Sequence, residues 1–157
     1  MKILLLSVGS TAKPWVKEGE NEYGKRVNRY VQFEHISIPD LKNGGKTPSD
    51  RQKQLEGEAI LARLQPADKV VLLDERGEQL TSRAFSSRMQ QHMNGGVKRL
   101  VFVIGGPYGF SEAVYNRADS LLSLSKMTFP HDLIRAMFIE QLYRAFTILN
   151  NEPYHHD

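Results

Sequence analysis

An apolar run that ends in a glycine-rich turn constrains this chain more than any other feature. Residues 100–104 read LVFVI, and residues 105–110 read GGPYGF. A continuous apolar run rich in β-branched and aromatic side chains predicts a strand that is buried on both faces. The turn cannot continue that strand, because Gly permits positive φ and Pro107 has no N–H to donate. We therefore predict a central strand followed by a sharp loop.

The residues after this turn predict the start of a helix. Ser111 is a suitable N-cap, and Glu112 places a negative charge in the first helical turn. Ligands commonly bind beyond the carboxyl end of a central parallel strand, although a tight turn without a ligand also explains these glycines. A second segment, residues 121–131 (LLSLSKMTFPH), favours the ligand-binding interpretation.

Length and composition indicate one soluble domain with a single core. The chain has 157 residues, of which 40% are hydrophobic and 25% are charged. No apolar run approaches the roughly 20 residues that cross a bilayer, so no membrane partner is expected. The absence of Cys excludes disulfides and thiolate metal sites and suits a cytoplasmic protein. A net charge of +3 permits an RNA partner without requiring one.

Alternating strand and helix patterns predict an α/β fold with a mostly parallel sheet flanked by helices, in a single domain over residues 1–157. Besides the central strand, strands are expected at residues 2–8, 31–38 and 69–73, the second of them nearer an edge. Helices are expected at residues 14–30, from Ser49 or Asp50 to about residue 64, at 82–93 after a Thr81 cap, from Ser111 to about residue 120, and at 132–150.

The loop after the first expected strand argues against two common ligand-binding folds. This loop, residues 9–13 (GSTAK), contains a single glycine. A dinucleotide-binding fold requires G-x-G-x-x-G at this point so that a pyrophosphate can approach the helix N-terminus. The most common methyltransferase fold also places its glycine-rich loop after its first strand.

Three loops are expected to lie side by side and form an apolar slot. They are the loop after Leu73, residues 105–109 and residues 124–129. Such a slot, with exposed backbone N–H and C=O groups, suits a flat and largely neutral heterocycle such as adenine. A phosphate is the weaker interpretation, because Pro107 removes a donor and no G-K-[ST] follows.

The last helix and the tail carry further candidate groups. Arg135 and Arg144 interrupt a largely apolar helix, either as surface arginines whose stems cover apolar surface or as clamps for phosphate or carboxylate. Pro153 stiffens the tail, and Tyr154 and His155 offer ring stacking, hydrogen bonding and proton exchange near neutral pH.

Other polar groups give weaker signals. Lys42 and Lys46 lie in a polar linker and are either solvated or in contact with RNA phosphates. The histidines do not have the spacing of a metal site, so no metal is expected. A G-x-S-x-G nucleophile motif is also absent.

Four motifs together resemble the RlmH (YbeA) family of SPOUT-class methyltransferases. They are residues 103–109 (VIGGPYG), 124–131 (LSKMTFPH), 140–145 (EQLYRA) and 153–155 (PYH). Chain length and element order match as well, so the resemblance covers essentially the whole chain. The motifs are specific in this order and spacing, whereas a lone Gly-Gly-x-x-Gly is not.

This resemblance implies a fold, an activity and partners. The fold is a SPOUT domain whose C-terminal part forms a deep trefoil knot. The activity is methyl transfer from S-adenosylmethionine to N3 of a pseudouridine in 23S ribosomal RNA, on the assembled ribosome and without a metal. The family is homodimeric, with each active site at the subunit interface.

Carried over by position, the resemblance also implies site residues. The cofactor-binding set is Leu73, Gly105, Leu124, Ser125, Lys126, Met127, Thr128 and Phe129. The catalytic set is His131, Arg135, Arg144, Tyr154 and His155, with His156 as a weaker candidate. His155 is expected to act as a base or to orient the substrate. Arg135 or Arg144 would favour the anion that develops at N3 or hold a phosphate, and Tyr154 would stack on the target base.

Alternative functions remain open at this point. One is a SPOUT methyltransferase that acts on another RNA, such as tRNA. A second is a ribosome-binding module without enzymatic activity. A third, an enzyme acting on nucleotide phosphates, rests on the glycine loop alone.

Overall fold

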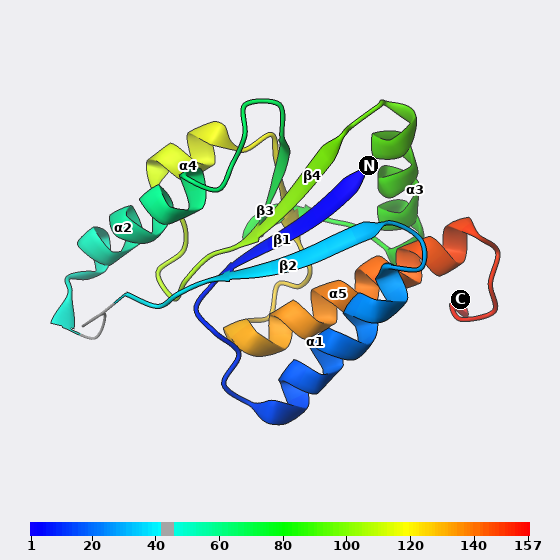
Figure 1. Ribbon diagram of the computed structural model, residues 1–157, viewed down its shortest axis with the longest axis horizontal. Coiled ribbons are helices and arrows are strands. Elements are labelled where there is room, and N and C mark those ends of the chain that lie inside the picture. Colours follow the sequence, from blue (N-terminus) through cyan, green and yellow to red (C-terminus); the bar gives the residue numbers. More distant parts are fainter. Residues whose placement is uncertain (42–45) are drawn as a thin grey trace.

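The computed structural model describes residues 1–41 and 46–157, and within them five strands form one parallel sheet. The strand order is β2-β1-β4-β3-β5 (Figure 1). The bounds are β1 Lys2–Val8, β2 Gln32–Ile38, β3 Lys69–Gln79, β4 Arg99–Ile104 and β5 Ser120–Ser123. The expected α/β class, the central position of β4 and the edge position of β2 are therefore confirmed.

Helices cover both faces of this sheet. They are α1 Pro14–Val27, α2 Ser49–Leu61, α3 Ser82–Asn94, α4 Glu112–Arg117 and α5 His131–Leu149. In Figure 1, α1, α3 and α5 lie on one side of the sheet and α2 and α4 on the other. Two clusters of buried hydrophobic residues form the core. Phe102 of β4 packs in one of them with Phe85 and Phe138, whereas the next residue, Val103, packs in the other. The continuous apolar pattern of β4 follows from this double burial.

Local hydrogen bonds determine where several helices begin and end. The helix expected at residues 14–30 stops at Val27, because the Asn28 side chain exchanges hydrogen bonds with the backbone of Phe33 at the start of β2. Thr81 and Ser111 accept hydrogen bonds from backbone N–H groups in the first turns of α3 and α4, as expected. The expectation of a Ser49 or Asp50 cap was wrong, since α2 begins after Pro48 without a side-chain cap.

The third strand extends further than the sequence suggested. We expected it to end at Leu73, but β3 continues to Gln79. It pairs with β5 on both sides of a register shift between Leu73 and Glu78. A Cβ on Gly77 would lie only 2.6 Å from the Leu122 backbone, so this close approach requires glycine. The polar residues 74–77 thus form an irregularity within the strand rather than a connecting loop.

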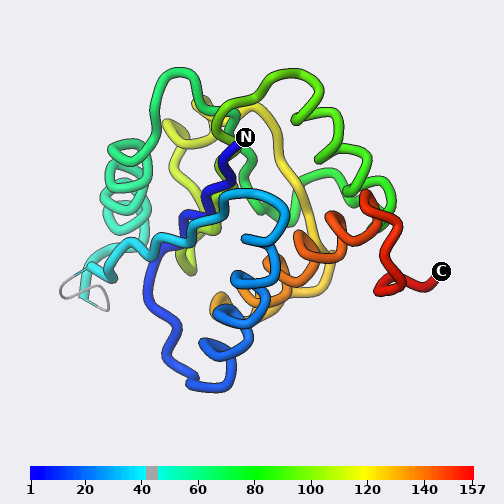
Figure 2. Tube along the Cα trace, turned by 45° about the vertical axis from the view of Figure 1, so that its right-hand side comes forward, coloured from blue at the N-terminus to red at the C-terminus, as the bar shows by residue number. Residues whose placement is uncertain are grey.

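The C-terminal helix lies against both of its neighbours on the sheet. Tyr30 and Phe146 stack with ring centroids 5.8 Å apart where α1 and α5 run side by side. Figure 2 shows the chain beyond α5 turning back near α3. No helix in the described parts of the chain is long and apolar enough to cross a membrane. The trefoil knot stays a prediction.

Candidate active site

Three adjacent strands in register build the floor of the expected slot. Leu73 of β3 pairs with Ile104 of β4 and with Leu122 of β5. Parallel pairing brings the carboxyl ends of β4 and β5 to the same edge of the sheet, beside the irregularity in β3. The segments that follow these strands therefore meet over one apolar floor.

A cavity of about 580 Å³ lies over this floor. Its size falls within the usual range for small-molecule sites. The expected cofactor residues that line it are Leu73, Gly105, Leu124, Ser125, Met127, Thr128 and Phe129. Lys126 does not line the cavity, and its side chain is exposed. The three loops therefore do lie side by side, with the polar residues of β3 in place of a loop after Leu73.

Serine side chains shape the segment between β5 and α5. Ser123 Oγ donates to the carbonyl of Ser125 over 3.0 Å, and the N–H of Met127 donates to Ser125 Oγ over 2.9 Å. These bonds fold residues 123–127 into a tight turn along the cavity wall. The Met127 side chain is 77% exposed, so a large apolar group stands at the rim of the cavity.

An acidic group also lines the cavity. Asp74 accepts hydrogen bonds from the hydroxyl of Tyr115 and from the backbone N–H of Arg76. Burial raises the pKa of Asp74, but these hydrogen bonds and the Arg76 charge outweigh burial and lower the pKa below its usual value. The cavity thus combines an apolar floor with a fixed negative charge. Sequence analysis missed Asp74 and Tyr115, because no local pattern reveals their pairing.

His131 is the one expected catalytic residue that lines the cavity. It is the first residue of α5, directly after Pro130. Burial and the charge of Arg135 lower its pKa, while Glu56, Asp132 and the Gly105 backbone act in the opposite direction. We therefore expect a neutral imidazole at pH 7.

Arg135 points away from the cavity and into the core. Its side chain is 2% exposed. It donates to the Val8 carbonyl over 2.6 Å and to Thr11 Oγ1 over 3.1 Å. Thr11 Oγ1 in turn donates to the buried carboxylate of Glu20 over 2.6 Å. Arg135 thus joins the start of α5 to the end of β1, a structural position that neither interpretation of its sequence pattern anticipated.

The other expected catalytic residues gather at the far end of α5. Arg144 donates to Glu140 Oε1 over 2.6 Å, and its guanidinium lies 4.7 Å from the centre of the Tyr154 ring. The Tyr154 hydroxyl also donates to Glu140 Oε1 over 2.9 Å. The pKa of Tyr154 is raised, mainly by burial and also by its hydrogen bonds to Tyr23 and Glu140. These contacts hold the tail against its own helix.

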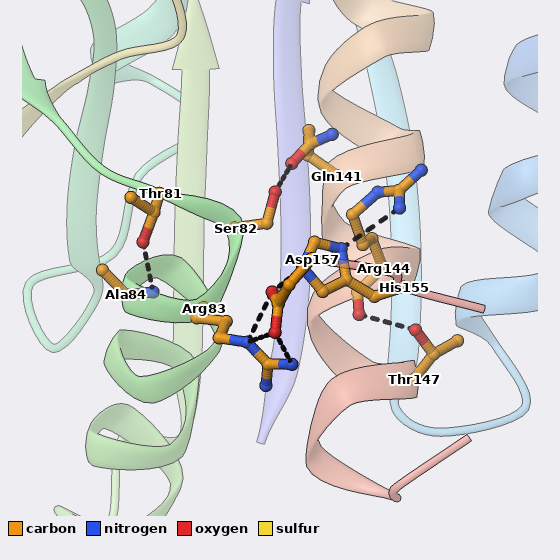
Figure 3. A network of polar contacts seen from close by, with 9 residues as sticks. All are labelled: Thr81, Ser82, Arg83, Ala84, Gln141, Arg144, Thr147, His155 and Asp157. Atoms are coloured by element: carbon orange, nitrogen blue, oxygen red, sulfur yellow. Dashed lines mark hydrogen bonds and ion pairs between the residues drawn. The ribbon is translucent and has the colours of Figure 1, made fainter. Parts of the chain in front are cut away.

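His155 is held by two partners in this cluster (Figure 3). Arg144 Nη1 lies 3.3 Å from His155 Nδ1, and His155 Nε2 lies 3.1 Å from Asp157 Oδ1. Because arginine can only donate, Nδ1 must accept, so the hydrogen is on Nε2 and points at Asp157. Arg83 of α3 anchors Asp157 through bonds of 2.5–2.9 Å. Sequence analysis did not identify Arg83 or Asp157.

The cavity and the C-terminal cluster are separate within one chain. Arg144 follows His131 by 13 positions on α5, which corresponds to about 20 Å along the helix axis. His156 is exposed and Lys46 is exposed, whereas Lys42 falls outside the described residues. Among the residues that the structure describes, no three His, Asp or Glu side chains gather as metal ligands would.

Comparisons with known proteins place the chain in a family. The family described as "Predicted SPOUT methyltransferase" matches residues 1–155. This chain belongs to the SPOUT methyltransferase family. Its relatives include the protein named ribosomal RNA large subunit methyltransferase H in Parabacteroides distasonis, 55% identical over the full length of both chains. The protein of the same name in Porphyromonas gingivalis is 53% identical, again over both full lengths.

A solved structure supports the fold of this SPOUT methyltransferase. The crystal structure of a protein assigned to a methylase family from Neisseria gonorrhoeae aligns with a TM-score of 0.50 at 13% identity. The alignment covers 99% of this chain and 86% of that one. The resemblance noted in the sequence motifs is therefore confirmed at the level of the family.

Proposed function

We propose that this protein transfers a methyl group from S-adenosylmethionine to N3 of a pseudouridine in 23S ribosomal RNA, with the assembled ribosome as substrate. Full-length relatives that carry the name ribosomal RNA large subunit methyltransferase H support this proposal. A ribosomal substrate would place the protein in the cytoplasm. The single observation that carries the proposal is the cavity over β3, β4 and β5, lined by seven of the eight expected cofactor residues.

The residues of the cavity fit S-adenosylmethionine. Apolar side chains such as Leu124 and Phe129 suit the adenine ring, and backbone groups of residues 105–106 and 124–128 can pair with its edge. Ionised Asp74 and nearby Glu75 suit ribose hydroxyls or the positive charge of the sulfonium. The bound cofactor would supply an electrophilic methyl group, so the protein need not activate the donor.

A second copy of the chain would complete the site. Tyr154 and His155 lie at the far end of α5 from the cavity of their own chain, so they would serve the cavity of a partner. Contacts to Glu140, Arg144 and Arg83 already hold the C-terminal tail in place within the single chain. Preformed contacts of this kind lower the entropy cost of building a shared site. We therefore propose a homodimer with two interfacial sites.

The protein must then help N3 of the pseudouridine lose its proton. His155 is our candidate for the base or for the group that orients it, and Arg144 would favour the anion that develops at N3. His155 Nδ1 faces Arg144 in the free chain, so accepting a proton there requires this contact to open. Tyr154 would position the target base by stacking.

The test is methylation of ribosomes that lack the modification, with radiolabelled S-adenosylmethionine and mapping of the labelled nucleotide. His155→Ala is expected to lower kcat by about 10²- to 10⁴-fold and to leave cofactor affinity unchanged. His92→Ala, a histidine of α3 outside both the cavity and the tail, is the matched control and should retain wild-type turnover. Equal loss of turnover and cofactor affinity in His155→Ala would contradict its assigned role.

The same assay separates the alternatives. Label in tRNA but not in ribosomes would favour another RNA substrate. Ribosome binding without cofactor binding would favour a module without enzymatic activity. Sedimentation of the free protein as a monomer at assay concentrations would contradict the shared site.

A further inference from the structure

A second cavity adjoins the cofactor cavity on the side of α2 and α4. Its volume is about 550 Å³. The two cavities share lining residues, which are Arg76, Tyr108, Phe110 and Tyr115. The second cavity adds Lys53 of α2 and Glu112 of α4 to this shared wall. A ligand in one cavity would therefore lie next to a ligand in the other.

The shared wall presents aromatic rings to solvent. Tyr108 is 51% exposed and is one of only three large hydrophobic side chains in the described structure that are mostly exposed. It stands in the loop after β4, where Pro107 fixes φ before it and the N–H of Gly109 donates to the Gly106 carbonyl over 3.1 Å, so the loop backbone is restrained. An exposed ring on a restrained loop is a stacking surface for a nucleobase.

Arg76 is held in place at the same wall. Its guanidinium lies 4.7 Å from the centre of the Tyr115 ring, and its Nε donates to Asp74 over 3.4 Å. Tyr115 is itself fixed by its hydroxyl bond to Asp74. The guanidinium is therefore oriented in advance, while its side chain stays 66% exposed and open to a further anion.

Lys53 supplies a second cation. Neither its ammonium group nor the Tyr108 hydroxyl forms a hydrogen bond or ion pair with residues 1–41 or 46–157. Glu112 is the acidic member of the lining, and a carboxylate accepts hydrogen bonds from a ribose hydroxyl or an exocyclic amine. Two cations, an exposed ring and one acceptor match the parts of a nucleotide better than those of a free phosphate.

We propose that this second cavity binds one nucleotide of the RNA substrate next to the methylated residue. The base stacks on Tyr108, and the phosphate lies between Lys53 and Arg76. Glu112 accepts a hydrogen bond from the ribose or the base. This inference rests on the proposed RNA methyltransferase function, and it names a substrate contact on the cofactor-bearing subunit itself.

Lys53→Ala tests the phosphate contact, because Lys53 lines only the second cavity. We expect about a fivefold weaker affinity for ribosomes and a salt-dependence slope smaller by about one unit. Affinity for S-adenosylmethionine, measured by calorimetry without RNA, should not change. Lys98→Ala is the matched control, because Lys98 is an exposed lysine at the amino end of β4. It should leave ribosome affinity at the wild-type value.

Tyr108 tests the stacking contact. Tyr108→Ala is expected to raise KM for ribosomes about tenfold or more, whereas Tyr108→Phe keeps the ring and should restore most of the affinity. Unchanged ribosome affinity in both Lys53→Ala and Tyr108→Ala would overturn the proposal. A loss confined to cofactor affinity would overturn it as well. Failure of the wild-type protein to bind or methylate ribosomes would instead refute the proposed function.

Discussion

Replacing Arg135 with Ala is expected to destabilise the protein strongly. The side chain is 2% exposed and donates to Val8 and Thr11, and the Glu20 carboxylate nearby is also buried. Oε2 of Glu20 has no hydrogen-bond partner among the described residues, and Lys17 lies as far as 3.8 Å from it, so the buried Arg135 charge adds to its compensation. Removing one member of a buried charged pair costs about 3–5 kcal/mol.

This cost corresponds to a large shift in thermal unfolding. For a chain of this length, each kcal/mol lowers Tm by about 2–4 °C, so Arg135→Ala should lower Tm by about 6–20 °C. Arg88→Ala is the control. Arg88 of α3 forms an ion pair with Glu78 at 3.0 Å in which both side chains are largely exposed, and such a pair contributes about 0.2–1 kcal/mol. Its Tm should fall by no more than about 4 °C.

Calorimetry or circular dichroism at fixed pH and protein concentration measures both shifts. If Arg135→Ala unfolds within about 2 °C of the wild type, the buried network does not anchor α5 as described. An equal loss in Arg88→Ala would contradict the contrast between buried and exposed pairs.

Other consequences concern His35, Gly77 and Asp157. The pKa of His35 is lowered to about 4, mainly by burial and also by nearby positive charges. As pH falls, the unfolded chain therefore binds a proton at this histidine before the folded chain does. Stability should therefore decline by about 2–3 kcal/mol between pH 6.5 and 4, and urea titrations of His35→Gln should show a flatter profile. Gly77→Ala places a Cβ 2.6 Å from the Leu122 backbone and should cost about 1–3 kcal/mol, whereas Gly19→Ala, with open space around it, should stabilise α1 by about 0.5–1 kcal/mol. Asp157→Asn removes the exposed carboxylate that binds Arg83 and should leave Tm unchanged while increasing protease access to the tail.

Much of the fold follows from local patterns in the sequence. The apolar runs of β1 and β4 and the caps at Thr81 and Ser111 are decided by neighbouring residues, so their prediction was correct. The position of the cavity over β3, β4 and β5 was also predictable, because parallel strands bring the segments after them to one edge.

Long-range contacts determined what the sequence could not reveal. Residues 74–77 have a loop-like composition, yet pairing with β5, about 45 residues away, keeps them within β3. Arg135 has the spacing of a surface residue, and only the approach of β1 buries it. The separation of the tail from the cavity depends on the length of α5, and no single motif in the sequence indicates that distance.

Binding of S-adenosylmethionine to the purified protein tests the central claim most directly. Isothermal titration should show binding to the wild type and none to Gly105→Val, because a Cβ at Gly105 would already lie 3.0 Å from the Phe110 ring and the added methyl groups would enter the cavity. A Tm measurement on Gly105→Val verifies that the variant is folded. Absence of binding to the wild type, or equal binding to both proteins, would contradict the assignment of this cavity to the cofactor.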